Sequence, residues 1–199
     1  MPYTFVHAIA ATSFKRLLAC RVLTTTSWRR LGRWQKLAVV LALLAIGPFF
    51  LPEHARIPVE GATSRDWNPQ SFWYQPWGTS GVHKGIDVFA PHGRAVIAPT
   101  AGLVVYRGTI AKGGNVVLLV GPKWRLHYFA HLGSIDVEPA LFVRRGTQLG
   151  TIGNSGNAVG KPPHLHYTVA SLLPRPWAFS TETQGWKRMY FMDPATVIK

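Results

Sequence analysis

The chain has 199 residues, of which 47% are hydrophobic and 15% are charged. This composition excludes an intrinsically disordered chain, and the length suits one domain of ordinary size with an additional segment. The net charge of +14 would attract nucleic acid, anionic lipid or an anionic polymer. The sequence contains no recognition-helix, zinc-finger or RNA-binding motif, so we expect no nucleic-acid partner.

The N-terminal part of the chain is typical of a membrane anchor. Residues 1–36 contain seven basic residues and no acidic one, and residues 37–51 are uncharged and apolar. Positive charge before an apolar run predicts an N-terminus in the cytoplasm and the rest of the chain outside the cytoplasmic membrane, periplasmic or extracellular. We therefore predict a basic cytoplasmic segment over 1–36 and a single-pass signal anchor, an uncleaved transmembrane helix, over 37–51.

Three other interpretations of this region are weaker. A cleaved signal peptide would have an unusually long basic region, and residues 52–55 lack a small residue at the expected cleavage position. A buried core helix does not suit the adjoining cluster of positive charge. Lipidation at Cys20 would require an apolar stretch before it, where Lys15 and Arg16 stand.

The remainder of the chain is typical of a β protein. Residues 52–62, with Pro52 and Pro58, are interpreted as a linker. From residue 63 to residue 199, short β-rich runs alternate with Gly and Pro, and no long helical period occurs. We therefore predict an all-β, mainly antiparallel, sandwich-like domain over 63–199. The expected strands are 95–98, 103–107, 116–120, 125–132, 148–152 and 165–170.

Three pairs of potential metal ligands are spaced by two or four residues: His83 and Asp87, His127 and His131, and His164 and His166. In an extended chain, side chains two or four residues apart point to the same face, so three adjacent strands could form a histidine-rich pocket. Imidazole and carboxylate groups are zinc ligands, and a catalytic zinc site has three protein ligands and one open position. Additional neutral imidazoles could orient water, accept its proton or stabilise an oxyanion.

Several short motifs around these histidines occur in a specific order. They are residues 83–87 (HKGID), 128–132 (YFAHL), 146–150 (GTQLG), 164–166 (HLH) and 193–194 (DP). With these motifs, residues 63–199 resemble the lysostaphin-like, LytM-type zinc metallopeptidases, which cut peptide bonds in peptidoglycan. The chain lacks the His-Glu-x-x-His motif of helical zinc peptidases.

The resemblance implies a role for five side chains. His83, Asp87 and His166 would bind one Zn²⁺ ion. His131 and His164 would act on the attacking water and the tetrahedral intermediate, and which of them is the general base stays open. The chain departs from the common pattern at Lys161–Pro163, a longer loop, and at Thr168, where an acidic residue is frequent.

Three further residues are candidates for contact with substrate. Strand alternation would place His127 on the same face as His131, at the pocket rim. Trp73 and Trp77 precede the first ligand and could line a groove for a sugar–peptide polymer. The alternative for such aromatic residues is that they close one end of the β core.

These interpretations predict a zinc-dependent endopeptidase of the cell wall, with its catalytic domain outside the membrane. Its partners would be peptidoglycan and, through the N-terminal helix, the cytoplasmic membrane; the sequence does not indicate a protein partner. Two alternatives stay open. One is a non-catalytic LytM-type regulator that activates a separate wall amidase, which the complete set of ligands argues against. The other is a peptidase that acts on a protein substrate.

Overall fold

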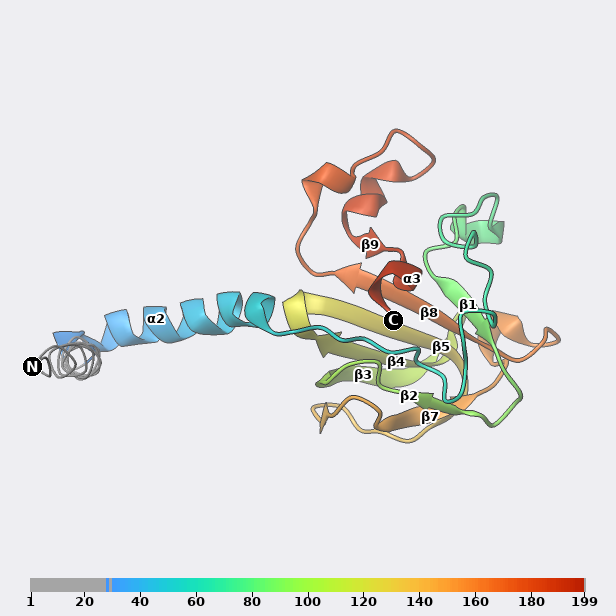
Figure 1. Ribbon diagram of the computed structural model, residues 1–199, viewed down its shortest axis with the longest axis horizontal. Helices are drawn as coiled ribbons and strands as arrows, with labels where there is room; N and C mark the ends of the chain where they lie inside the picture. Colours follow the sequence, from blue (N-terminus) through green and yellow to red (C-terminus); the bar gives the residue numbers. More distant parts are fainter. Residues whose placement is uncertain (1–27, 29, 199) are drawn as a thin grey trace, which may run out of the picture. The chain divides into compact units, whose positions relative to one another are not determined.

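The computed structural model describes residue 28 and residues 30–198. The described residues divide into two units that meet between residues 47 and 48, a helical unit and a β unit (Figure 1). Most of the basic segment predicted over 1–36, including Cys20, lies outside the described residues.

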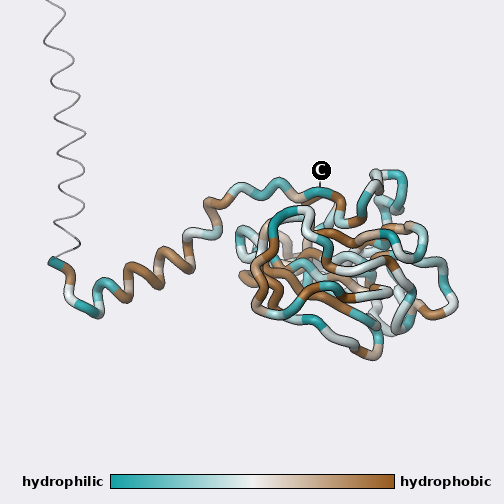
Figure 2. Tube along the Cα trace, turned by 90° about the horizontal axis from the view of Figure 1, so that it is seen from below, coloured by the Kyte–Doolittle hydropathy of each residue, from teal (hydrophilic) through white to brown (hydrophobic). Residues whose placement is uncertain are grey.

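The helical unit contains α2 (Arg33–Ile46), and the 3-10 helix η1 (Gly47–Phe50) follows it directly. Together these 18 residues are long and apolar enough to cross a membrane. No residue of α2 is buried, and most of the helix is coloured as hydrophobic in Figure 2. The helix begins four residues before the predicted start at 37, because the side chain of Gln35 accepts a hydrogen bond from the Gly32 N–H (2.9 Å) and closes the first turn.

The β unit confirms the predicted all-β fold. One sheet of nine strands contains the path β1 (Ile86–Phe89), β8 (His164–Ser171), β5 (Arg125–Ile135), β4 (Gly114–Gly121), β3 (Gly102–Ile110) and β6 (Phe142–Val143). The strand β2 (Ala95–Ile97) pairs with β7 (Gln148–Ile152), β7 also pairs with β5, and β9 (Phe191–Met192) pairs with β8. Every pair of these strands is antiparallel.

Short helical turns precede, connect or follow the strands. They are η2 (Gly78–Ser80), η3 (Pro122–Trp124), η4 (Gly156–Ala158), η5 (Pro176–Ala178), η6 (Gly185–Met189) and α3 (Pro194–Val197). Six of the strands overlap the runs predicted from the sequence, whereas β1, β6 and β9 were not predicted.

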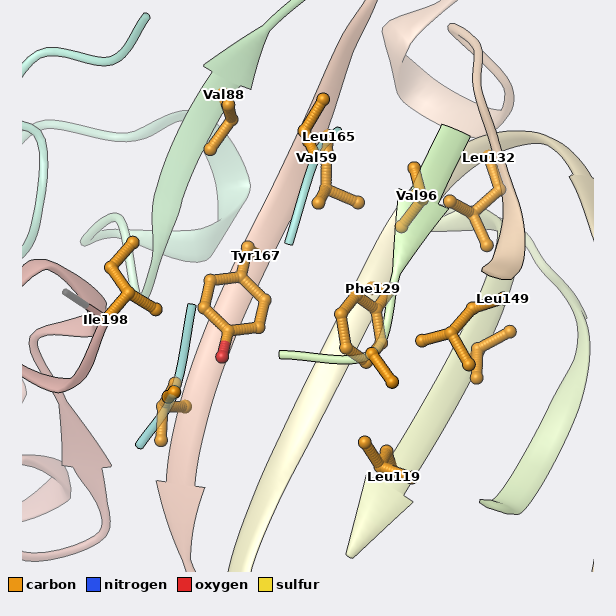
Figure 3. Packing of buried hydrophobic residues seen from close by; sticks show 14 of the residues in the cluster. Val59, Val88, Val96, Leu119, Phe129, Leu132, Leu149, Leu165, Tyr167 and Ile198 are labelled. Carbon is orange, nitrogen blue, oxygen red and sulfur yellow. The ribbon is translucent and has the colours of Figure 1, made fainter. Parts of the chain in front are cut away.

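The hydrophobic core lies on one face of β8, β5 and β4 and is closed by β2 and β7 (Figure 3). Alternate residues of these strands enter it, so Tyr167 of β8 and Phe129 of β5 are fully buried, with ring centroids 5.4 Å apart. The intervening residues of β8 and β5 face the opposite side of the sheet. That side carries the candidate site.

The linker predicted over residues 52–62 is wrong. Ala55 and Val59 are each only 2% exposed and form β-bridges with Ile198 and Val96. The carbonyl of Pro58 accepts a hydrogen bond from the Ile97 N–H (2.8 Å). Proline lacks only its own N–H, so it is compatible with this edge pairing, and the segment belongs to the β domain.

Residue Glu53 fixes the start of this segment. Its buried carboxylate forms an ion pair with Arg125 at the beginning of β5. Burial raises the pKa of Glu53, although the neighbouring guanidinium of Arg125 counteracts this shift. The ion pair ties the chain that follows η1 to the strand on which two of the candidate histidines lie.

Candidate metal centre

The three predicted metal ligands come together from two neighbouring strands and one loop. Asp87 is on β1, and its register partner on β8 is His166. His83 lies in the loop before β1, and Gly85 lets this loop approach β8 closely, since a Cβ there would lie 2.4 Å from the Tyr167 carbonyl oxygen. The ligand atoms of His83, Asp87 and His166 lie within 4.8 Å of one another.

The distances among these atoms fit a small tetrahedral cation. His83 Nε2 is 3.2 Å from Asp87 Oδ1 and 3.0 Å from His166 Nδ1, and His166 Nδ1 is 2.8 Å from Asp87 Oδ1. Ligands at about 2.0–2.1 Å from a tetrahedral Zn²⁺ are separated by about 3.3 Å. Lone-pair atoms this close repel one another unless a proton or a cation lies between them. The donor set therefore fits zinc.

Hydrogen bonds orient both imidazole rings. The Nδ1 atom of His83 is 2.9 Å from the carbonyl oxygen of Ser71, which can only accept, so Nδ1 carries the hydrogen and Nε2 the lone pair. The Nε2 atom of His166 is 3.1 Å from the hydroxyl of Thr168, which can accept its hydrogen and leave Nδ1 as the ligand atom. Thr168 stands where an acidic residue is frequent in the common pattern, and its hydroxyl can orient the His166 ring in place of a carboxylate.

The electrostatics of Asp87 and His166 favour an anionic carboxylate beside a neutral imidazole. Burial by itself would raise the pKa of Asp87, but its contacts with His166 and His83 outweigh burial and hold that pKa well below its usual range. Burial lowers the pKa of His166, although Asp87 counteracts this shift. Neutral imidazole and ionised carboxylate are the forms that bind a metal ion.

His131 and His164 lie beside the ligands. Their ring centroids are 5.1 Å apart, and the His131 ring is 6.0 Å from that of His166. The Nδ1 atoms of His131 and His164 are 2.9 Å and 2.8 Å from the carbonyl oxygens of Ser155 and Pro162, so both rings carry their hydrogen on Nδ1. Burial lowers the pKa of His131 to about 4, so its Nε2 holds a free lone pair at neutral pH.

The backbone at His131 departs from regular strand geometry. Its φ is 64°, and the register between β4 and β5 shifts between Asn115 and Val117. Two hydrogen bonds hold this strained conformation, from the His131 N–H to Gly113 (2.8 Å) and from its ring to Ser155. The irregularity turns the His131 side chain toward the ligands.

The prediction that His127 shares a face with His131 is wrong for this reason. The irregularity interrupts the alternation of β5, and His127 points into the core, fully buried. Its Nδ1 is 2.7 Å from the Tyr167 hydroxyl, and burial lowers its pKa to about 3. A side chain without exposed surface cannot contact substrate.

The two candidate tryptophans have different positions. Trp77 lines the cleft and packs against the His83 ring, with centroids 4.1 Å apart. Trp73 is only 5% exposed, packs against Phe191 and Arg188 and does not line the cleft, so its predicted contact with substrate is wrong. Trp73 instead helps to close one end of the β core, which is the alternative expected for such aromatic residues.

The five polar residues line an open cleft of about 880 Å³. Tyr128 and Ala130 of β5 form part of its floor. Burial raises the pKa of Tyr128, and its ring is 6.3 Å from that of His166. Tyr128 was not among the predicted site residues, although its spacing of two from Ala130 on β5 places both on one face.

The comparison with known families agrees with this arrangement. The sequence profile described as Peptidase family M23 matches residues 81–174, which contain the three ligands and both additional histidines. These residues belong to peptidase family M23. The expected resemblance to the LytM-type peptidases is confirmed at the level of the domain.

Two curated relatives differ in what their names state. The L-Ala–D-Glu endopeptidase of Bacillus subtilis is 30% identical over 177 residues, which cover 81% of this chain and 53% of the relative. The murein hydrolase activator NlpD of Escherichia coli is 30% identical over 105 residues, 52% of this chain and 27% of the relative. The chain thus spans about half of the first relative and less of the second.

Two solved structures share the fold. An M23 peptidase of Pseudomonas aeruginosa superposes with a TM-score of 0.52 at 23% identity, over 85% of this chain and 63% of its own. The catalytic domain of the antimicrobial peptidase lysostaphin from Staphylococcus simulans superposes with a TM-score of 0.50 at 27% identity, over 61% of this chain and 83% of its own.

Proposed function

We propose that this protein is a zinc-dependent endopeptidase that hydrolyses peptide bonds in the cross-links or stems of peptidoglycan. The observation that carries the proposal is the convergence of His83, Asp87 and His166 in an open cleft that His131 and His164 also line. A regulator without catalytic activity has no need for the complete set. Membership of residues 81–174 in the M23 family supports the proposal.

In this reading, His83 Nε2, Asp87 Oδ1 and His166 Nδ1 hold one Zn²⁺ ion. Bound there, zinc would supply a Lewis acid that polarises the scissile carbonyl and lowers the pKa of water. The Nε2 atom of His131 or of His164 accepts a proton from the attacking water, and the imidazolium formed in this way then donates a hydrogen bond to the developing oxyanion. The carbonyl groups of Ser155 and Pro162 stabilise those imidazolium rings through Nδ1–H.

The N-terminal helix would place this chemistry at the cell wall. Residues Arg33–Phe50 would form the single-pass anchor, with the basic residues before them in the cytoplasm. The β domain begins its packing at Glu53, three residues after the end of η1. A spanning helix would keep the β domain attached to the membrane, whereas a cleaved signal peptide would release the domain.

Digestion of purified peptidoglycan by the detergent-solubilised full chain tests the proposal. We expect cross-linked peptides to disappear, a chelator to stop their loss, and added zinc to restore it, with mass spectrometry identifying the bond cleaved. A folded, zinc-loaded protein that leaves peptidoglycan intact would contradict the proposal.

Two control reactions separate the alternatives. The likeness to NlpD motivates a mixture of this protein with a purified wall amidase, in which stimulation without cleavage by the protein alone would indicate a regulator. Digestion of a glycine-rich protein in place of peptidoglycan would indicate a peptidase for protein substrates. The His166→Ala variant serves in both reactions, because a regulator would keep its effect in this variant and an enzyme would lose its activity.

A further inference from the structure

Three lysine side chains line the same cleft as the metal ligands. Lys84 lies in the loop between His83 and β1, Lys112 in the turn between β3 and β4, and Lys161 in the loop before β8. Among the residues that line the cleft, Asp87 is the one carboxylate, and His83 and His166 engage it. Apart from the metal centre, the charge of the cleft wall is therefore positive.

Two of these lysines gather at one place. The Nζ atom of Lys84 donates to the carbonyl oxygens of Ser80 (3.0 Å) and Val82 (3.3 Å). The Nζ atom of Lys112 donates to the hydroxyl of Thr79 (2.8 Å). Both ammonium groups thus contact η2, at the adjacent residues Ser80 and Thr79.

The ammonium groups of Lys84 and Lys112 are not neutralised within the described part of the chain. The ion pairs found there involve other residues, and the acceptors of these two lysines are uncharged. An ammonium group has three donors, of which Lys84 uses two and Lys112 uses one. Two ammonium groups that contact adjacent residues of η2 repel each other, and an anion that bridges them would relieve the repulsion.

We propose that Lys84 and Lys112, with the wall formed by η2, bind a free carboxylate of the substrate close to the cleaved bond. This inference rests on the proposed function and narrows its substrate class to acidic peptides. Peptidoglycan stems carry free carboxylates, whereas glycine bridges and other uncharged peptides do not. Lys161, which also lines the cleft, adds to its positive potential.

A pair of matched peptides tests this carboxylate subsite. The first is a cross-linked stem peptide with free carboxylates, and the second differs only in that these carboxylates are amides. Their dissociation constants are measured by calorimetry with the zinc-loaded full chain in detergent, carrying His131→Ala to suppress turnover. We expect the acid to bind about tenfold more tightly than the amide, because a hydrogen bond to a charged group contributes about that factor.

Two variants of that protein decide which residues are responsible. The double change Lys84→Met and Lys112→Met should abolish the preference for the acid and leave the affinity for the amide unchanged. Lys123→Met removes one positive charge outside the cleft and should keep the preference. A loss of affinity that is equal for both peptides would mean that the two lysines only brace η2, and this would overturn the subsite.

Turnover of both peptides by the protein with His131 intact separates this inference from the proposed function. A preference in binding without cleavage of either peptide would contradict the peptidase and keep the carboxylate subsite. Cleavage of both peptides at the same kcat/KM, with equal affinity, would keep the peptidase and overturn the subsite. An increase in ionic strength should reduce the preference, since both lysines are accessible to solvent ions.

Discussion

The two faces of the β5–β8 pair use the same alternation of residues for opposite purposes. On the cleft face, His166 and Tyr128 surround the candidate metal centre. On the core face, Tyr167 and His127 are fully buried, and a hydrogen bond joins the Tyr167 hydroxyl to His127 Nδ1 (2.7 Å). Both histidines lie on the central strands and have lowered pKa values, yet His166 has three polar neighbours and His127 has one.

The comparison of His166 with His127 shows that burial alone does not indicate a functional histidine. The Nε2 atom of His127 is buried without a hydrogen-bond partner within the described residues, whereas both ring nitrogens of His166 have partners. We expect substitutions on the cleft face to change activity at nearly constant stability. Substitutions on the core face should change stability at nearly constant activity.

The largest effect is expected for His166→Ala, which removes a metal ligand from the cleft face. The kcat for peptidoglycan should fall by roughly a thousandfold or more, because the chemistry depends on the complete ligand set. Zinc content, measured by atomic emission, should fall with it. Tyr167→Phe, its neighbour on the core face, is the matched control and should keep both. Cleavage at the normal rate by His166→Ala would contradict the assignment of this ligand.

A smaller loss is expected for His131→Ala and His164→Ala. Removal of a general acid or base lowers kcat by about 10²- to 10⁴-fold, and these rings bind no metal, so the zinc content should stay at one ion per chain. Steady-state kinetics and metal analysis of each variant measure the two quantities. The ring whose loss lowers kcat more is assigned as the base. Loss of zinc from either variant would instead indicate a ligand.

On the core face, His127→Leu should change stability and its dependence on pH. The pKa of His127 is lowered to about 3, so the folded protein holds it neutral while the unfolded chain binds a proton below about pH 6.5. Its contribution to stability is therefore present above pH 6.5 and is lost as the pH falls toward 3, by up to about 1.4 kcal/mol per pH unit.

Urea denaturation at several pH values measures this prediction. The free energy of unfolding of the parent protein should fall more steeply between pH 6 and pH 4 than that of His127→Leu. This range lies below the ordinary pKa of histidine, about 6.5, and above the lowered pKa of His127. At neutral pH, the free energy of unfolding of His127→Leu should be about 1–2 kcal/mol lower than that of the parent protein, because the Tyr167 hydroxyl loses its hydrogen-bond partner. Equal slopes for the two proteins would show that His127 titrates normally in the folded state.

The smallest effect is expected for Trp77→Ala at the cleft rim. This ring packs on His83 but is 38% exposed, so its removal should raise KM a few-fold and leave the free energy of unfolding almost unchanged. Trp73→Ala, in the closed end of the domain, should instead cost about 3–5 kcal/mol of stability. Thermal unfolding and KM, measured together, distinguish the two positions, and a reversed outcome would exchange their roles.

Much of this molecule followed from local pattern. Alternating apolar residues between Gly and Pro predicted the strands that form the sheet, because the period of two is a property of the extended chain itself. The spacings of His83 with Asp87 and of His164 with His166 predicted which side chains would meet, because these pairs lie on or next to regular strands. The apolar run after residue 36 predicted a helix.

Tertiary contacts decided the rest. The orientation of the His127 side chain relative to His131 depended on the positive φ of His131. Gly113 and Ser155, from other parts of the chain, hold that conformation. The docking of residues 52–62 depended on partners in β2 and at the C-terminus, more than 30 residues away along the chain. Lys84 and Lys112, from two different loops, likewise contact η2 through tertiary hydrogen bonds. Periodicity reports only the neighbours along one strand, whereas these positions are set by residues that the fold brings together.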